Sequence, residues 1–184
     1  MKLYATLLAG LILVSPTTTA SQISPNLVDV EKAVCLAQNM YYEARNQGSA
    51  GILAVTAVVF NRVRDSRFPN TICGVIKQGP TRESWKTRKI KILPPKERKY
   101  YPVKNRCQFS WYCDGLSDKP KDLETYERFL NYAIGWLHST IPFIDITDGA
   151  LFYHADSVTP GWAKTKQKTV EIQDHIFYRW KLGK

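Results

Sequence analysis

The chain has 184 residues, of which 44% are hydrophobic and 12% are aromatic, so it is long enough and apolar enough to bury one compact core. Its formal net charge is +10 at pH 7, and most of that charge lies in one segment. No internal repeat or low-complexity segment is present, which excludes a repeat array.

The N-terminus has the layout of a secretory signal peptide. A lysine follows the initiator methionine, residues 3–14 are almost wholly apolar, and residues 15–20 end in the small residue Ala20. This pattern predicts cleavage after Ala20. The apolar run is short for a membrane span, and an uncleaved anchor is the alternative. We therefore expect a signal peptide at 1–20 and a single domain at 21–184, which is secreted, periplasmic or held in the cell envelope.

The first predicted helix carries a candidate general acid. Ser24-Pro25 is a plausible start, and apolar residues recur at helical spacing from Val30 to Ala44. Glu43 lies three residues after Met40, on the flank of the apolar face. A carboxylate held against apolar neighbours has a raised pKa and is suited to donate a proton. The simpler interpretation of this stretch is a surface glutamate beside Arg45.

A second helix should follow directly. Gly48 ends the first helix, Ser49 can cap the next, and residues 50–64 are apolar on nearly every side. Such a helix is a buried one, so we expect 50–64 to be the central core helix. The short connection makes the two helices neighbours, which would hold Glu43 against the core. Another short helix is predicted at Thr71–Lys77.

Residues 79–105 form a basic segment with nine Lys or Arg against Glu83 and Glu97, a net charge of +7. It contains Pro94-Pro95 and has no helical or strand period, so it is predicted to be a long loop or insertion. Such a surface suits nucleic acid, anionic lipid or an acidic cell-envelope polymer. Export argues against nucleic acid. A solvated charged loop is the alternative.

Four cysteines are present: Cys35, Cys73, Cys107 and Cys113. In an oxidising compartment an even number favours two disulfides, and the sequence leaves all three pairings open. A zinc site is the rival interpretation, but Cys107 and Cys113 are six residues apart and no CxxC pair exists.

In the C-terminal part, the spacing of the apolar residues changes from that of a helix to that of strands. A helix with one apolar stripe is predicted at about 120–138, and residues 150–155 and 169–173 alternate as half-buried strands do. Thr159–Trp162 supplies turn residues between these strands. Residues 175–180 either extend the second strand or pack separately.

Two histidines lie in this region. On a strand, His154 and Asp156 lie on the face opposite Tyr153, and His154 either orients a substrate or is a hydrogen-bonded structural residue. With Asp174 and His175 they make a weak metal candidate, but no HxxxH or HExxH spacing exists. We therefore predict no metal site and no cofactor.

Several stretches stand in a characteristic order. They are Cys35–Arg45, Ala54–Val63, Phe68–Ile76, Cys107–Trp111 with Cys113–Gly115, Ala150–Ala155 with Trp162, and His175–Arg179. Together they resemble the SleB/CwlJ family of bacterial cell wall hydrolases, the spore cortex-lytic enzyme type, over residues 30–180. Two departures occur. The family's usual Glu-Ala-Arg-Gly-Glu is here Glu43-Ala-Arg-Asn46-Gln47, and the basic segment is longer than expected.

The resemblance implies an α+β fold, mainly helical and lysozyme/lytic-transglycosylase-like, with a small C-terminal β-hairpin. It also implies an enzyme that cleaves the β-1,4 bond between N-acetylmuramic acid and N-acetylglucosamine in peptidoglycan, with one catalytic glutamate that maps onto Glu43. Such cleavage needs a second carboxylate unless the substrate supplies its own nucleophile. The neutral Asn46-Gln47 therefore favours a lytic transglycosylase that forms a 1,6-anhydro product. The alternatives are a hydrolytic muramidase that also uses Asp114 or Asp156, and a non-catalytic wall-binding module.

Further residues are candidates for binding the sugar chain, since aromatic faces, amides and hydroxyls suit pyranose rings. They are Gln108, Phe109, Ser110, Trp111, Tyr153 and His154. A disulfide-pinned loop that packs on the core is the alternative for residues 108–111. The expected partners are peptidoglycan glycan strands, with acidic cell-envelope polymers as candidates for the basic segment. Neither nucleic acid nor stable membrane insertion after signal cleavage is expected.

Overall fold

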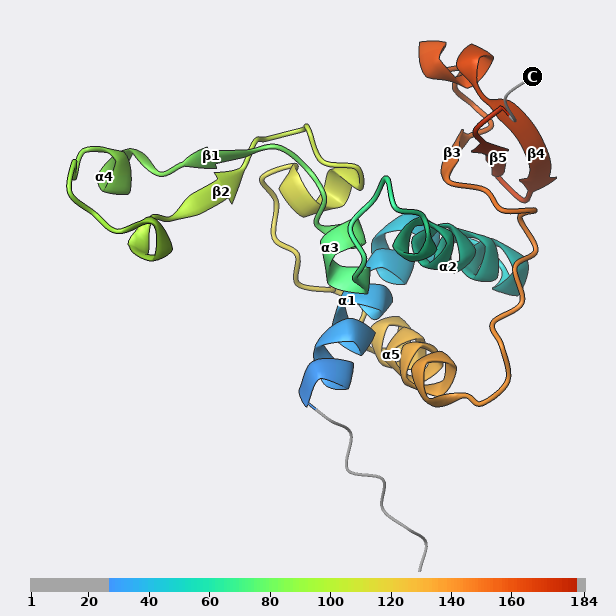
Figure 1. Ribbon diagram of the computed structural model, residues 1–184. Coiled ribbons are helices and arrows are strands. Elements are labelled where there is room, and N and C mark those ends of the chain that lie inside the picture. Colours follow the sequence, from blue (N-terminus) through green and yellow to red (C-terminus); the bar gives the residue numbers. More distant parts are fainter. Residues whose placement is uncertain (1–26, 182–184) are drawn as a thin grey trace, which may run out of the picture.

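In a computed structural model of the protein, the structure of residues 27–181 is described, and a group of helices lies beside a small sheet (Figure 1). The predicted signal peptide and the predicted helix start at Ser24-Pro25 lie outside these residues. The helices are α1 (Leu27–Ala44), α2 (Ser49–Arg64), α3 (Ile72–Ile76), α4 (Trp85–Arg88) and α5 (Leu123–His138). The strands are β1 (Thr81–Glu83), β2 (Tyr100–Pro102), β3 (Phe152–Ala155), β4 (Gln167–Ile172) and β5 (His175–Arg179). The predicted α+β class is confirmed.

The helical core forms around α1 and α2, as the apolar periods predict. Helix α1 packs against α5, α3 and α2. Leu36 and Met40 of α1 are fully buried, and so are Val55 and Val59 of α2. Phe129 of α5 closes the same cluster. Because α2 is buried along most of its length, the prediction of a central core helix is confirmed.

The predicted cap of α2 is wrong. Ser49 is the first helical residue, and the N-cap is Gly48, which offers no side chain to the helix. A distant side chain takes over this role, because the backbone N–H of Gly51 donates to Oε1 of Gln173 over 2.9 Å. A Cβ added at Gly48 or Gly51 would lie 2.5 Å or 2.3 Å from the Gln173 side chain. Both glycines therefore leave room for the end of the Gln173 side chain.

The C-terminal sheet has the order β3-β5-β4, with both neighbours antiparallel to β5. The predicted pairing is wrong in detail: the strands expected at 150–155 and 169–173 do not pair with each other, because β5 lies between them. Residues 175–179, expected to extend the second strand or to pack separately, form this central strand. Phe177 of β5 packs with Ala54 and Val58 of α2, and Tyr153 of β3 contacts both this cluster and the helical core. The sheet thereby places β3 beside the C-terminal end of α1.

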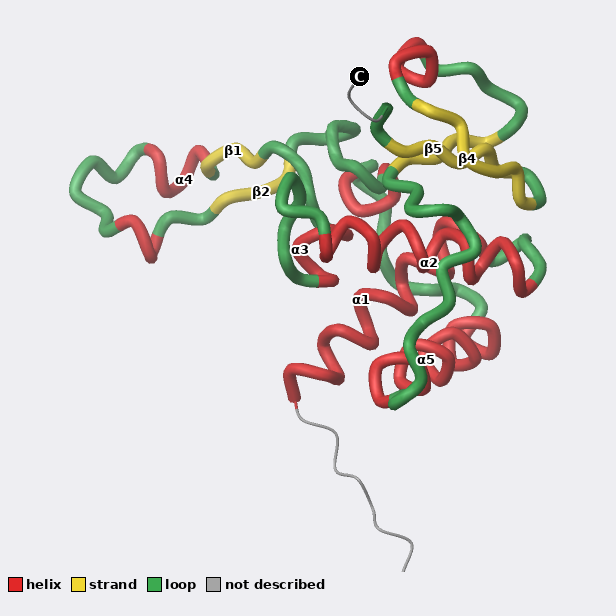
Figure 2. Tube along the Cα trace, turned by 45° about the vertical axis from the view of Figure 1, so that its right-hand side comes forward, coloured by secondary structure: helices red, strands yellow, loops and turns green. Residues whose placement is uncertain are grey.

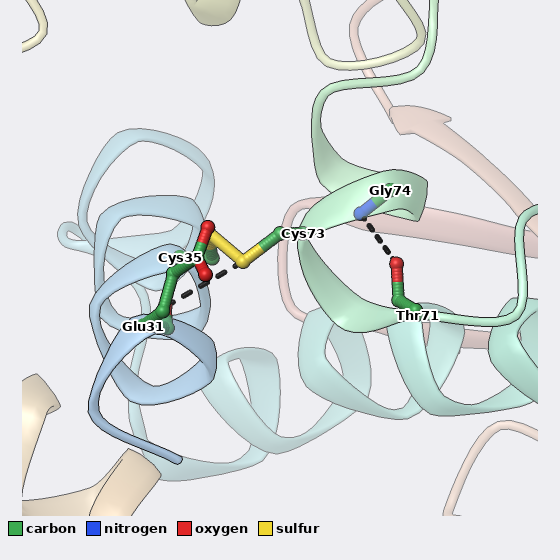
Figure 3. Close-up of a disulfide and its surroundings, with 5 residues drawn as sticks. All are labelled: Glu31, Cys35, Thr71, Cys73 and Gly74. Carbon is green, nitrogen blue, oxygen red and sulfur yellow. Dashed lines mark hydrogen bonds between the residues drawn. A yellow bond between two sulfur atoms is a disulfide. The ribbon is translucent and has the colours of Figure 1, made fainter. Parts of the chain in front are cut away.

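Two disulfides select one of the three possible pairings. Cys35 of α1 is bonded to Cys73 of α3, with their Cα atoms 5.5 Å apart (Figure 3). Cys107 is bonded to Cys113, with 6.0 Å between Cα atoms. The first bond ties two helices together, and the second closes a short loop. Both are structural disulfides, as predicted.

Residues 79–105 extend away from the body of the molecule (Figures 1 and 2). They were predicted as a loop without regular structure, but β1 and β2 pair as an antiparallel ribbon with α4 and a 3₁₀ turn, Pro95–Glu97, at its far end. Strands of three residues are too short to show a period, so the sequence carries no signal for them. Among residues 27–181, no helix combines the length and apolar character that a membrane span requires.

Candidate active site

Glu43 is the penultimate residue of α1, half-buried and in contact with the sheet. The hydroxyl of Tyr153, on β3, donates a hydrogen bond to its Oε2 over 2.8 Å. Burial raises the pKa of the Glu43 carboxyl, and the Tyr153 hydrogen bond and the charge of Arg62 offset only part of that rise. The pKa of the Tyr153 phenol is raised well above its ordinary value by burial and by the carboxylate, so this phenol remains a donor.

Arg62 is a buried cation close to this carboxyl, with only 4% of its surface exposed. Its Nε donates to the carbonyl oxygen of Leu151 over 2.7 Å. Its guanidinium carbon lies 5.2 Å from the ring centroid of Phe68 and 5.3 Å from that of Phe109. Burial lowers its pKa to about 10, so the group stays charged at neutral pH. Among the residues that the structure describes, Nη1 has no hydrogen-bond partner.

Arg62 was missed as a site residue in the sequence. It stands at the end of an otherwise apolar helix, and a charged residue in a buried helix is the signal that marks it. Its positive charge favours the charged form of Glu43 and so offsets part of the rise in pKa that burial causes.

Two cavities share Glu43 as a lining residue. One has a volume of about 260 Å³ and brings together five of the six predicted sugar-binding residues. Its lining is Glu43, Arg62, Gln108, Phe109, Ser110, Tyr153, His154, Ala155 and His175. The other has a volume of about 350 Å³ and is lined by Tyr42, Glu43, Arg45, Asn46, Gln47, Ala155, Asp156, Ser157, Asp174 and His175. The Glu43 carboxyl therefore lies at the junction of the two cavities.

Trp111 is the sixth predicted residue, and it lines neither cavity. It is 7% exposed, stacks on Tyr42 with 4.8 Å between ring centroids, and its Nε1 donates to Oδ1 of Asn39 over 3.3 Å. Phe109 is also buried and belongs to the helical core cluster, so its ring does not offer an open platform to a sugar. This part of the loop packs on the core, as the alternative interpretation holds.

The two histidines of the sheet differ in their surroundings. His154 uses both ring nitrogens within the protein, at 2.8 Å from the carbonyl oxygen of Ala155 and 3.0 Å from the hydroxyl of Tyr178. These two hydrogen bonds hold the His154 ring in place, and its side chain also lines the smaller cavity. His175 lines both cavities, and burial lowers its pKa, so it is neutral at neutral pH. Within residues 27–181, no group of three or more His, Cys, Asp or Glu side chains could hold a metal ion.

The carboxylates considered as partners of Glu43 lie in different places. Asp156 lines the larger cavity with Glu43. Asp114 accepts a hydrogen bond from the backbone N–H of Leu116 over 2.7 Å in a turn, and it is not among the lining residues of either cavity. Gln47, at the position where the resemblance leads one to expect an acid, donates from Nε2 to Oδ2 of Asp174 over 2.9 Å. The neutral Gln47 therefore donates a hydrogen bond to the Asp174 carboxylate, whereas an acid at position 47 would repel that carboxylate.

Replacing Tyr153 with phenylalanine should raise the pKa of Glu43 further, because the lost hydrogen bond stabilises the carboxylate. The pKa can be followed by NMR titration of carboxyl-labelled glutamate. Tyr178→Phe is the matched control, since its hydroxyl, on the neighbouring strand, bonds His154 instead. An unchanged Glu43 pKa in Tyr153→Phe, or an equal rise in the control, would contradict the assigned contact.

Comparison with known proteins finds a matching family model and similar sequences. Residues 46–178 match the family model described as Cell Wall Hydrolase. The chain is 28% identical over 144 residues to the spore cortex-lytic enzyme of Oceanobacillus iheyensis, which covers 77% of this chain and 39% of that protein. It is 27% identical over 143 residues to the spore cortex-lytic enzyme of Bacillus subtilis, covering 77% of this chain and 35% of that one. The chain thus spans well under half the length of these relatives.

A solved structure is similar over most of its length. The catalytic domain of the germination-specific lytic transglycosylase SleB from Bacillus anthracis superposes with a TM-score of 0.51 at 26% identity, covering 85% of this chain and 98% of that one. The family match begins three residues after Glu43, so the assignment of Glu43 rests on the geometry described above.

Proposed function

Because the chain belongs to the Cell Wall Hydrolase family, we propose that it is an exported enzyme that cleaves peptidoglycan glycan strands between N-acetylmuramic acid and N-acetylglucosamine. The observation that carries this proposal is a half-buried carboxyl, that of Glu43, with a raised pKa at the junction of two cavities. A polymer needs binding sites on both sides of the bond that breaks, and the two cavities that share Glu43 as a lining residue are the candidates for these sites. The names of the spore cortex-lytic relatives and of SleB agree with such a substrate.

The first step is proton donation. A protonated Glu43 gives its proton to the glycosidic oxygen as the bond from that oxygen to C1 of muramic acid breaks, and positive charge develops on C1 and the ring oxygen. The raised pKa keeps part of the enzyme protonated at higher pH than an exposed glutamate would allow. Tyr153 holds one carboxyl oxygen and stabilises the carboxylate that forms.

The second step needs a nucleophile. Glu43, now ionised, takes the proton of the muramic acid 6-hydroxyl while the hydroxyl oxygen bonds to C1. This closes a 1,6-anhydro ring, consumes no water and returns the proton to Glu43. One carboxyl is sufficient for both transfers, which fits the neutral Asn46-Gln47 beside it.

The products test this mechanism directly. Purified sacculi treated with the enzyme should release soluble muropeptides that end in a 1,6-anhydro sugar, lighter by one water molecule than a reducing end. Mass spectrometry before and after borohydride distinguishes the two, because borohydride reduces only reducing ends. Reducing ends as the main product would overturn the transglycosylase assignment.

A hydrolytic muramidase is the second candidate, and Asp156 is favoured over Asp114 as its second carboxylate, because Asp156 lines the larger cavity with Glu43 and Asp114 lines neither cavity. In that case Asp156→Asn should lose activity and the products should be reducing ends. A transglycosylase should retain most of its activity in the same variant. Sacculi that bind the protein but release nothing soluble, from wild type and Glu43→Gln alike, would identify a wall-binding module instead.

A further inference from the structure

The extended segment 79–105, hereafter the basic arm, exposes large apolar side chains at its far end. Ile92 is 93% exposed, Trp85 57% and Ile90 48%. All three lie between the two strands of the ribbon in sequence, and that part of the chain is furthest from the body (Figures 1 and 2). Single exposed apolar residues are common, but three at the end of a projecting ribbon form an unusual surface.

Cations surround these apolar side chains. Residues 84–99 contain seven Lys or Arg and one acid, Glu97, a net charge of +6. Six of the cations are exposed: Lys86, Arg88, Lys89, Lys91, Lys96 and Lys99. The Nζ of Lys89 lies 4.7 Å from the Trp85 ring centroid. The end of the basic arm therefore combines strong positive charge with apolar and aromatic surface.

The basic arm has its own internal bonds, so the arrangement of its end is defined. The side chains of Arg98 and Glu83 form an ion pair at 2.8 Å, and both are largely covered. The backbone N–H of Ser84 donates to the carbonyl oxygen of Lys99 over 2.7 Å. Thr87 is buried, and its hydroxyl accepts from the N–H of Lys99 over 3.4 Å. The polar groups face one another, and the isoleucines remain outside.

We propose that the basic arm docks the protein on the surface of a bilayer that contains anionic phospholipid. Ile90, Ile92 and Trp85 enter the interfacial layer, and the lysines around them contact the headgroups. Tryptophan suits this layer because it is apolar at one end and polar at the other. A hydrophilic polyanion would account for the charge, but it would leave two isoleucines in water. The apolar side chains therefore favour lipid over an acidic polymer.

Docking would also position the candidate active site. The base of the basic arm joins the wall of the cavity, since the backbone N–H of Gln108 donates to the carbonyl oxygen of Gln78 over 2.9 Å. Gly79 lies against the second disulfide, where an added Cβ would be 2.9 Å from Sγ of Cys107. Lipid bound at one end thus fixes the distance of the cavity from the membrane, and glycan close to the membrane becomes the accessible substrate.

Co-sedimentation with vesicles tests the proposal with the full chain. Vesicles of phosphatidylcholine with phosphatidylglycerol should bind the protein, and vesicles of phosphatidylcholine alone should bind much less. The double variant Ile90→Ser/Ile92→Ser should weaken binding at least about tenfold. The matched control is Ile141→Ser/Ile144→Ser, which changes two isoleucines that are 74% and 69% exposed outside the basic arm and should leave binding unchanged. The N-terminal apolar run is identical in the wild type and in both isoleucine variants, so any difference in vesicle binding among them arises from the substituted isoleucines.

A charge variant completes the test. Replacing Lys89, Lys91 and Lys96 with glutamine should weaken binding by about fivefold for each lysine. Equal binding to neutral vesicles, equal loss in both isoleucine variants, or loss only in the charge variant would overturn the proposal, and the last result would indicate a hydrophilic polyanion. Muropeptide release from isolated sacculi should be unchanged in Ile90→Ser/Ile92→Ser, which separates this question from the catalytic one.

Discussion

Glu43→Gln should reduce the release of soluble muropeptides from sacculi by at least about a hundredfold, because a positioned acid or base contributes roughly 10² to 10⁴ to such a rate. Glutamine has nearly the same shape and can still accept the hydrogen bond from Tyr153, but it cannot donate or take up a proton. The loss should be larger than for a residue that transfers one proton, since Glu43 serves in both steps of the proposed mechanism. Turbidity of the sacculi and muropeptide mass measure it.

The same variant should be more stable than the wild type at neutral pH. The pKa of Glu43 is raised in the folded protein even with Arg62 and Tyr153 close by, so folding favours its protonated form. The stabilising effect of that proton is fully present below the pKa of the unfolded chain and is lost as pH rises through the folded value. Glutamine never ionises, so its melting temperature should exceed that of the wild type at pH 7, and the difference should shrink in acid.

Glu127→Gln is the matched control, because Glu127 is an exposed carboxylate on α5. It should leave both activity and melting temperature close to those of the wild type. Full activity in Glu43→Gln would remove Glu43 from the mechanism. A lower melting temperature of Glu43→Gln at neutral pH would mean that the charged carboxylate is stabilised here, contrary to the direction of its pKa.

Local patterns predicted α1, α2 and α5, because each of these helices buries one stripe or most of its surface against the core, whereas α4, in which only Thr87 is buried, was not predicted. Leu36 and Met40 are fully buried at the spacing that defines the first stripe, and the apolar run of α2 is the central helix. The start of α2 could not be predicted in this way, because its cap comes from Gln173, 122 residues after Gly51. Contacts of that kind depend on the tertiary fold and leave no local signal.

The same distinction applies to the candidate site: residues with a local signal were predicted, and contacts from distant parts of the chain were not. Glu43 was found from its helix and from ordered motifs, and five of the six predicted sugar-binding residues line a cavity with it. The environment that sets its pKa was not predictable, because Tyr153 and Arg62 reach it from β3 and α2. Trp111 has the residue type that suits a sugar, but its position between Tyr42 and Asn39 makes it a packing residue.

Removing the Cys35–Cys73 disulfide should cost about 4 kcal/mol of unfolding free energy, and removing Cys107–Cys113 about 2 kcal/mol. The difference follows from the length of chain that each bond closes, since the sequence separations are 38 and 6 residues. A longer closed loop removes more freedom from the unfolded chain. Paired Cys→Ala variants in chemical denaturation measure both values. A loss of about 4 kcal/mol is a large part of the 5–15 kcal/mol that typically holds a domain folded.

The loss of activity should be larger for the Cys107–Cys113 variant than for the Cys35–Cys73 variant, the reverse of the order for stability. Activity has to be measured below the melting temperature of each variant. The Cys107–Cys113 bond encloses the residues that carry Gln108 and Ser110 into the cavity, so its loss should loosen that wall and raise KM. The Cys35–Cys73 bond joins α1 to α3 (Figure 3), and neither cysteine lines either cavity, so the surviving folded enzyme should cleave sacculi nearly as the wild type does. Equal losses of activity in the two variants would mean that residues 108–110 do not depend on their disulfide for position. A larger stability loss from the short loop would mean that native packing around Cys107, rather than chain entropy, sets the value of these bonds.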